Sequence, residues 1–243
     1  MAEPTHLAEL EQGLKLWNQW RDNNPKLIPD LMEVDLSGQN LNGFNLFQAE
    51  LMGANLSGSL LIYTDLTEAC VVGAIFDKAI LRHAYLNRAK LTRTSFQRAD
   101  LTMTSLEEAN LIRVNFSLAD LEGANLYKTN LIAVNFTKAN LSRVNFTEAV
   151  MTGANLNEAK LIGSNFYKAN LTGADLVKAN LKGANLSKAN LSYTNLREAN
   201  LSETNLRKAN LTGADLTHAN LHGANLIEAE LDGVILNLSL IHI

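Results

Sequence analysis

The side chains that most often carry out catalysis or bind metals are few in this chain of 243 residues, and they are scattered. There is one cysteine, Cys70, and the five histidines are His6, His83, His218, His222 and His242. His218 and His222 have the four-residue spacing of a helical metal-binding pair, but their segment is predicted to be β structure. We therefore expect no metal site and no arrangement of a nucleophile beside a base.

Asparagine or aspartate recurs at every fifth position through most of the chain, and such a row suggests two binding roles. Calcium requires several carboxylates around one ion, whereas asparagine dominates here and basic residues stand at nearby positions. An ice-binding surface would need sustained rows of threonine, which the sequence lacks. The glycines fit turns rather than a phosphate-binding motif. The sequence thus predicts a protein that is not an enzyme and has no cofactor.

A large apolar residue occupies every fifth position from Leu31 to Leu236 without a phase shift. These 42 positions hold 34 Leu, six Phe, one Met and one Val, and the unit is Ala-(Asn/Asp)-Leu-x-x, as in residues 179–183. A period of five matches neither the α-helix nor the flat strand. The chain must therefore turn a corner in every unit, which is typical of a solenoid.

A second period, of 20 residues, predicts four units in each coil. Phenylalanine recurs at this interval in two sets: Phe76, Phe96, Phe116 and Phe136, then Phe146 and Phe166. The charge two residues after the core position alternates at the same interval through Glu68, Arg88, Glu108, Lys128, Glu148 and Lys168, and again through Lys138, Glu158, Lys178 and Glu198. Thirteen of the 14 glycines fall at this position too, which indicates a corner with positive φ. We predict a square coil and a rod roughly 50 Å long.

These repeats resemble the pentapeptide repeat family, and the resemblance covers residues 31–236. It implies an all-β solenoid, namely a right-handed quadrilateral parallel β-helix of about ten coils. The segment 13–21, which contains Trp-Asn-Gln-Trp-Arg, resembles the leader of bacterial members of the family. Because the sequence shows neither a signal peptide nor a membrane-spanning apolar run, we expect a cytoplasmic protein without membrane contact.

Residues 1–30 are predicted to form a capping helix and a linker. Apolar residues at three- and four-residue spacing predict one amphipathic helix from Thr5 to Asp22, with Thr5 as its N-cap. We expect this helix to cover the apolar end of the first coil through Leu10, Leu14, Trp17 and Trp20. A membrane-surface or partner-binding helix is the alternative, although its polar face is not notably basic.

The repeat pattern fails after Leu236, where residues 237–243 are predicted to be an irregular tail. Leu240 stands where asparagine or aspartate is usual, and no charged residue caps this end. Three interpretations remain open: the C-terminal coil pairs with a second copy, the natural chain continues, or the tail is a non-native junction.

The charges are distributed unevenly along the chain, although the net charge is only −4. Residues 31–77 hold six acidic and no basic residues, residues 78–208 hold ten acidic and 18 basic residues, and residues 209–243 hold four acidic and no basic residues. Some members of the family mimic duplex DNA and inhibit or protect type II topoisomerases, but that role implies an acidic surface throughout. Direct nucleic-acid binding is not expected, because few aromatic residues point outward.

One group of apolar residues interrupts the polar outward positions. Leu60 and Ile80 replace asparagine or aspartate, and Ile75 and Tyr85 lie on neighbouring units. The sequence offers two interpretations of Leu60, Ile75, Ile80 and Tyr85, namely sequence drift without a partner, which it favours, and a contact patch for another protein. The leading hypothesis is a non-enzymatic structural or protein-interaction scaffold, and the DNA-mimic is the second.

Overall fold

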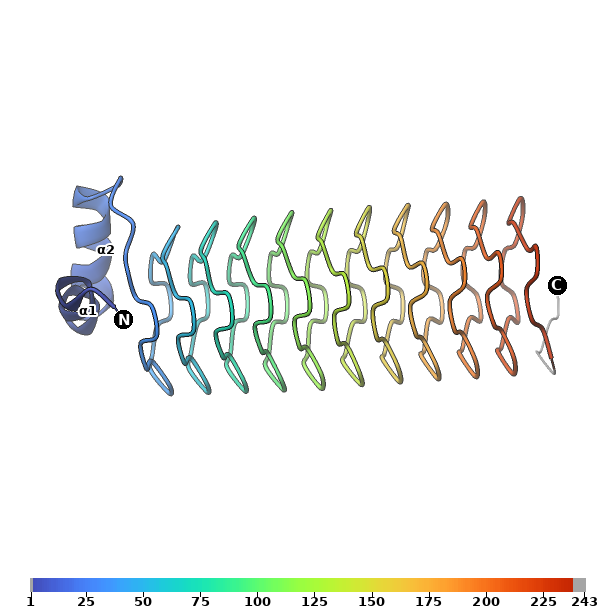
Figure 1. Cartoon of the computed structure of the whole chain (residues 1–243), viewed down its shortest axis with the longest axis horizontal. Coiled ribbons are helices and arrows are strands. Elements are labelled where there is room, and N and C mark those ends of the chain that lie inside the picture. Colours follow the sequence, from blue (N-terminus) through green and yellow to red (C-terminus); the bar gives the residue numbers. More distant parts are fainter. Residues whose placement is uncertain (1, 238–243) are drawn as a thin grey trace.

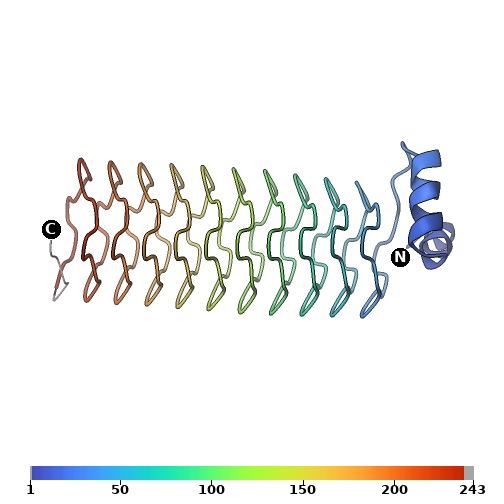
Figure 2. The same cartoon turned by 180° about the vertical axis from the view of Figure 1, so that it is seen from behind.

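The computed structural model describes residues 2–237, which form a straight rod with two short helices at its N-terminal end (Figure 1). Helix α1 spans Pro4–Glu11 and helix α2 spans Leu14–Asn23. The second view shows the same stack of coils from behind, with the helices across one end (Figure 2). Among the described residues, no helix is long and apolar enough to cross a membrane. The cytoplasmic location stays a prediction.

The prediction of a single N-terminal helix is wrong. Gly13 has φ 92°, a conformation that breaks the helix between α1 and α2. The predicted N-cap is also wrong, because Glu3 precedes α1 and Thr5 lies inside it, donating from Oγ1 to Glu3 Oε1 at 3.1 Å. The helical repeat therefore restarts after Gly13. The side chains of α2 that face the rod thus differ from those expected for one continuous helix.

Parallel bridges connect each coil to the next, and every bridge joins residues 20 apart, from Asp30–Glu50 to Asp215–Ile235. This spacing confirms four units per coil. Within residues 2–237, each side of a coil contributes a single bridging residue rather than a longer strand. The first coil defines the names of the four sides by their bridging residues: side A at Asp30, side B at Asp35, side C at Asn40 and side D at Asn45.

The core is a column of buried leucines with two stacks of phenylalanine. Successive rings from Phe76 to Phe136 stack at centroid distances of 4.8–5.1 Å, and Phe146 stacks on Phe166 at 4.8 Å. Phe136 meets Phe146 edge to face at 6.0 Å, because the second stack lies across the core from the first. Both columns predicted from the 20-residue period are confirmed.

The corners explain the glycines. From residue 33 to residue 233, the residue two positions after each core residue is left-handed, and 28 of these corner residues are not glycine. Ala133 has φ 54° and Gly153 has φ 63°. A left-handed conformation costs an L-residue about 1–2 kcal/mol, so the array carries this strain repeatedly.

This strain predicts opposite effects at two corners. A methyl group on Gly153 would meet no atom within 4 Å, so Gly153→Ala tests the backbone alone and should destabilise the rod by about 1 kcal/mol. Ala133→Gly should leave stability unchanged or raise it slightly. Equilibrium denaturant unfolding measures both, and a clear loss in Ala133→Gly would contradict the corner assignment.

Candidate interaction surfaces

The charged corners form ion pairs that run along the rod. Arg88 Nε lies 2.9 Å from Glu108, and Lys128 and Lys168 flank Glu148 at 3.9 and 3.3 Å. A second corner repeats the pattern, with Lys138–Glu158 at 3.5 Å and Lys178–Glu198 at 3.6 Å. The alternating charges predicted from the sequence therefore make contact in these pairs. Exposed ion pairs stabilise little, but they neutralise much of the central surface.

The asparagine row is explained by the backbone that it supports. Within one unit, Asn185 Oδ1 accepts the amide N–H of Ser187 at 3.1 Å. Between coils, Asn185 Nδ2 donates to Asn165 Oδ1 at 2.9 Å, and Asn145 donates to Asn125 at 3.0 Å. These amides bridge the turn and the next coil, so the row serves the fold.

The histidine and cysteine side chains of residues 2–237 do not gather into a metal-binding cluster. His6 Nδ1 accepts the N–H of Asp30 at 3.0 Å, and burial is the main cause that raises the pKa of the Cys70 thiol. Within residues 2–237, no three His, Cys, Asp or Glu side chains are placed to share a metal ion. His242 lies outside the described residues.

The sequence-predicted contact patch does not lie on one side of the rod. Leu60 and Ile80 pair on side C, whereas Ile75 lies on side B and Tyr85 on the opposite side D. Ile75 and Tyr85 are 42% and 46% exposed, so both face solvent in different directions. The prediction that these four residues form one patch is wrong, because the chain turns a corner between units and the units of one coil therefore face different sides of the rod.

Sequence reasoning missed Tyr63, which occupies the corner between sides C and D. Its side chain is 57% exposed and stacks on His83 with centroids 5.0 Å apart. The 20-residue spacing of these two residues was the signal that could have revealed the pair. We define the apolar edge as Leu60, Tyr63, Ile80 and Tyr85, which follow sides C and D around this corner.

The two helices cover part of the first coil. Leu10 and Trp17 are buried, and Trp20 packs beside Trp17 with centroids 5.0 Å apart. Leu14 is 44% exposed and lies near the corner at Gly43, so it contributes less than the sequence suggested. The proposed capping role thus rests on Leu10, Trp17 and Trp20.

Polar groups of α2 bind the backbone of side D and of the segment that joins α2 to the first coil. Trp17 Nε1 donates to the carbonyl of Asn45 at 2.8 Å, and Asn18 Oδ1 accepts the N–H of the same residue at 2.9 Å. Arg21 is buried, and its guanidinium donates to the carbonyls of Leu27 and Phe47 at 2.6 and 2.9 Å. Burial is the main cause that lowers the pKa of Arg21.

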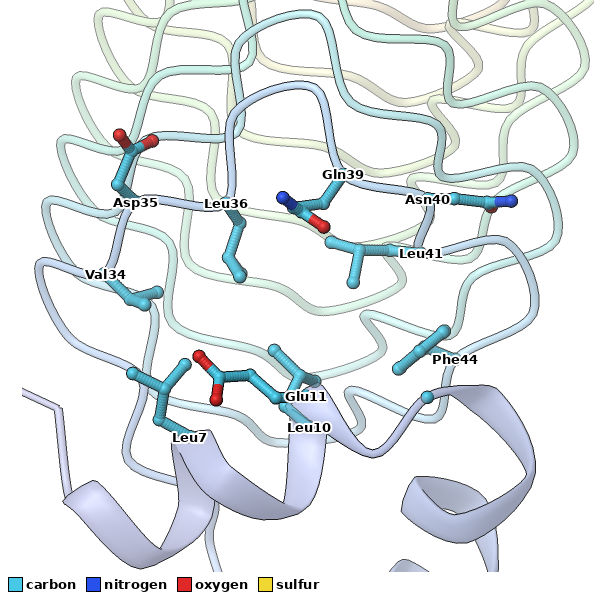
Figure 3. A pocket seen from close by; sticks show the side chains of 11 residues that line it. Leu7, Leu10, Glu11, Val34, Asp35, Leu36, Gln39, Asn40, Leu41 and Phe44 are labelled. Carbon is cyan, nitrogen blue, oxygen red and sulfur yellow. The ribbon is translucent and has the colours of Figure 1, made fainter.

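A cavity of about 350 Å³ separates α1 from sides B and C of the first coil. Figure 3 shows Leu7, Leu10 and Glu11 on the helix side, facing Leu36 and Leu41 across the cavity. Its floor is apolar and its rim is polar, which is the usual composition of a binding site.

The C-terminal coil also presents apolar side chains to solvent. Leu231, Ile235 and Leu236 are 41–45% exposed. The self-association expected at this coil stays a prediction. Of the predicted tail 237–243, residues 238–243 lie outside the described residues.

Comparison with known proteins agrees with this geometry. The family model "Pentapeptide repeats" matches residues 30–62, 45–77, 59–98, 164–202 and 199–237, and "Pentapeptide repeat region" matches residues 89–166. No curated protein sequence matches.

The solved structures that are similar to this chain include HetL and QnrB1. HetL, a pentapeptide repeat protein involved in heterocyst differentiation regulation in Nostoc sp. strain PCC 7120, is 34% identical, with a TM-score of 0.78 over 92% of this chain and 98% of HetL. Full-length QnrB1, a plasmid-mediated fluoroquinolone resistance protein, is 21% identical, with a TM-score of 0.51 over 85% of this chain and 92% of QnrB1, and this likeness concerns the fold alone. The chain belongs to the pentapeptide repeat family.

Proposed function

We propose that this protein is a non-enzymatic scaffold that binds another protein on the outside of its rod. The apolar edge carries the proposal. On side C the bridging residues before and after this pair, Asn40 and Asp100, are polar. Leu60 and Ile80 are apolar and pair with each other. Exposed Tyr63 and Tyr85 extend this surface around the corner. Aromatic side chains in a desolvated contact are strong contributors to protein binding.

The relationship to HetL supports a regulatory role within this class. HetL is described as involved in heterocyst differentiation regulation, and nearly its whole length aligns with this chain. We infer that this protein acts by holding a protein partner, with its rod as a rigid support for the apolar edge.

DNA mimicry is the weaker candidate. A mimic presents carboxylates that track a phosphate lattice, whereas the acidic residues Glu108, Glu148 and Glu158 each contact a basic residue here. A gyrase supercoiling assay should therefore show neither inhibition nor protection by this protein.

A double substitution tests the apolar edge. Leu60→Asn with Ile80→Asn restores the residue type that the repeat favours outside, so thermal unfolding should be unchanged while partner binding falls at least about tenfold, or 1.4 kcal/mol. The measurement is quantitative recovery of proteins from native cell extract, followed by titration of the protein recovered. Ile75→Asn is the matched control, because it makes the same kind of change on side B. Equal recovery with both variants would contradict the proposal.

A further inference from the structure

The N-terminal edge of any coil in this rod has a fixed hydrogen-bonding pattern. The amide of Glu50 donates back to the carbonyl of Pro29 at 2.8 Å, while its carbonyl accepts from the amide of Leu31 at 2.8 Å. Each bridging residue thus turns one donor and one acceptor toward the preceding coil. In the first coil no preceding coil exists, so four bridging residues need other partners.

The helical segment supplies partners on two of the four sides. On side A, the amide of Asp30 donates to His6 Nδ1 at 3.0 Å, and its carbonyl accepts from the amide of Glu3 at 3.1 Å. On side D, Asn18 and Trp17 bind the amide and the carbonyl of Asn45. The backbone N–H and C=O of both bridging residues are therefore paired, as they would be by a coil.

Sides B and C lack such partners. Among the described residues, nothing pairs with the backbone N–H or C=O of Asp35 or Asn40, or with the C=O of Ser37. Asp35 and Asn40 are exposed, unlike most bridging residues of later coils. This open edge forms the rim of the cavity under α1, whose apolar floor includes Leu36 and Leu41 (Figure 3).

We propose that an extended peptide segment of another protein binds here as an added parallel strand along sides B and C. The backbone pattern selects this occupant, because every bridge in the rod is parallel and the free groups repeat the spacing used between coils. Strand addition of this kind derives affinity from main-chain hydrogen bonds and selectivity from side-chain pockets. The cavity has room for one or two apolar side chains above Leu36 and Leu41.

The charge of the site points to a basic peptide. Both charged residues that line the cavity, Glu11 and Asp35, are acidic, and residues 31–77 contain no lysine or arginine. Hydrogen bonds from Ser37 hold the pKa of Asp35 below its ordinary value, so this carboxylate stays ionised at neutral pH. A segment with apolar residues facing inward and lysine or arginine at its corners complements both features.

Hydrogen exchange locates the open edge in the free protein. The amides of Asp35 and Asn40 should exchange at nearly unprotected rates, whereas those of Asp30 and Asn45 should exchange slowly because the helices bind them. Binding of a peptide strand should then slow exchange at Asp35, which donates to the peptide. Protection of Asp35 and Asn40 in the monomer without peptide would overturn the open-edge assignment.

The binding test uses a ten-residue peptide that copies residues 174–183. This segment pairs on sides B and C of a later coil and carries Lys178 and Lys182. Titration of the full-length protein by fluorescence anisotropy should give saturable binding that weakens with salt. A peptide with both lysines replaced by glutamate should bind at least about tenfold more weakly, a difference of 1.4 kcal/mol.

Variants of the protein assign the binding to this edge. Asn40→Pro removes an N–H that the fold does not use, and should weaken binding at least about tenfold. Glu11→Gln should weaken it about three- to fivefold, whereas Glu9→Gln, on the same helix but outside the cavity, should not. Glu11→Gln leaves the strand edge intact, so it remains informative if Asn40→Pro misfolds.

The possible outcomes separate this proposal from the role of the apolar edge. Leu60→Asn with Ile80→Asn should leave peptide affinity unchanged, because these residues lie outside the cavity. Absence of saturable binding, or binding that Glu11→Gln and a folded Asn40→Pro both leave unchanged, would overturn the peptide site. Concentration-dependent protection of Asp35 without peptide would instead assign the edge to a second copy of the chain.

Discussion

Phe116→Ala should destabilise the rod by roughly 3 to 5 kcal/mol, because it removes a ring from the middle of the longer phenylalanine stack. Phe116 has no exposed surface, and its ring lies 5.1 Å from those of both Phe96 and Phe136. The coil cannot collapse into the resulting cavity, since bridges above and below fix its distance from its neighbours. Chemical denaturation with circular dichroism measures the loss.

Lys138→Ala provides the control for this experiment. The lysine lies outside on a corner and contacts Glu158 in solvent, so its removal should leave the unfolding curve almost unchanged. Equal destabilisation by the two substitutions would refute the assignment of inner and outer positions.

Trp17→Ala should release the helices from the first coil at a cost of roughly 3 to 5 kcal/mol in docking free energy. The substitution removes a fully buried ring and the hydrogen bond from its Nε1 to the carbonyl of Asn45. Coils in a solenoid contact only their neighbours, so the later coils should remain folded. The uncovered end should then promote association between molecules.

Two measurements follow the release of the helices. Iodide should quench the fluorescence of Trp20 more strongly in the variant, and light scattering should show a rise in mass with concentration. Leu14→Ala is the matched control, because Leu14 is already half-exposed and should change neither measurement. A monomeric variant with shielded Trp20 would show that Trp17 does not hold the helices in place.

The coil could be predicted from the sequence because each of its rules is local and repeated. The leucine at every fifth position identifies the residues that point into the core, and the interval from Phe76 to Phe96 gives the number of sides in each coil. Pairing between coils follows from the same interval, as the contact of Arg88 with Glu108 shows. The right-handed turn implied by family resemblance stays a prediction.

The ends and surfaces were harder to predict because they depend on how separate elements dock. A single residue, Gly13, resets the helical phase, so Leu14 turns toward solvent while Trp17 is buried. The open backbone at Asp35 and Asn40 follows from which sides the helices cover, and no residue pattern records that choice. The 20-residue interval also places Ile75 and Tyr85 on different sides of the rod. This follows only when the interval is applied to the outward positions as well as to the core.

Between Phe136 and Phe146 the phenylalanine stack moves to the opposite side of the core. This move shows which insertions and deletions the array can accommodate. Gaining or losing five residues would preserve every buried leucine, yet would rotate all downstream outer residues by a quarter turn. Ten residues would exchange opposite walls, which is the relation between Phe136 and Phe146. Only a multiple of twenty keeps each lysine and glutamate in its original column. Inheritance of an intact surface therefore favours duplication or deletion of whole coils, even though the core itself accepts single units.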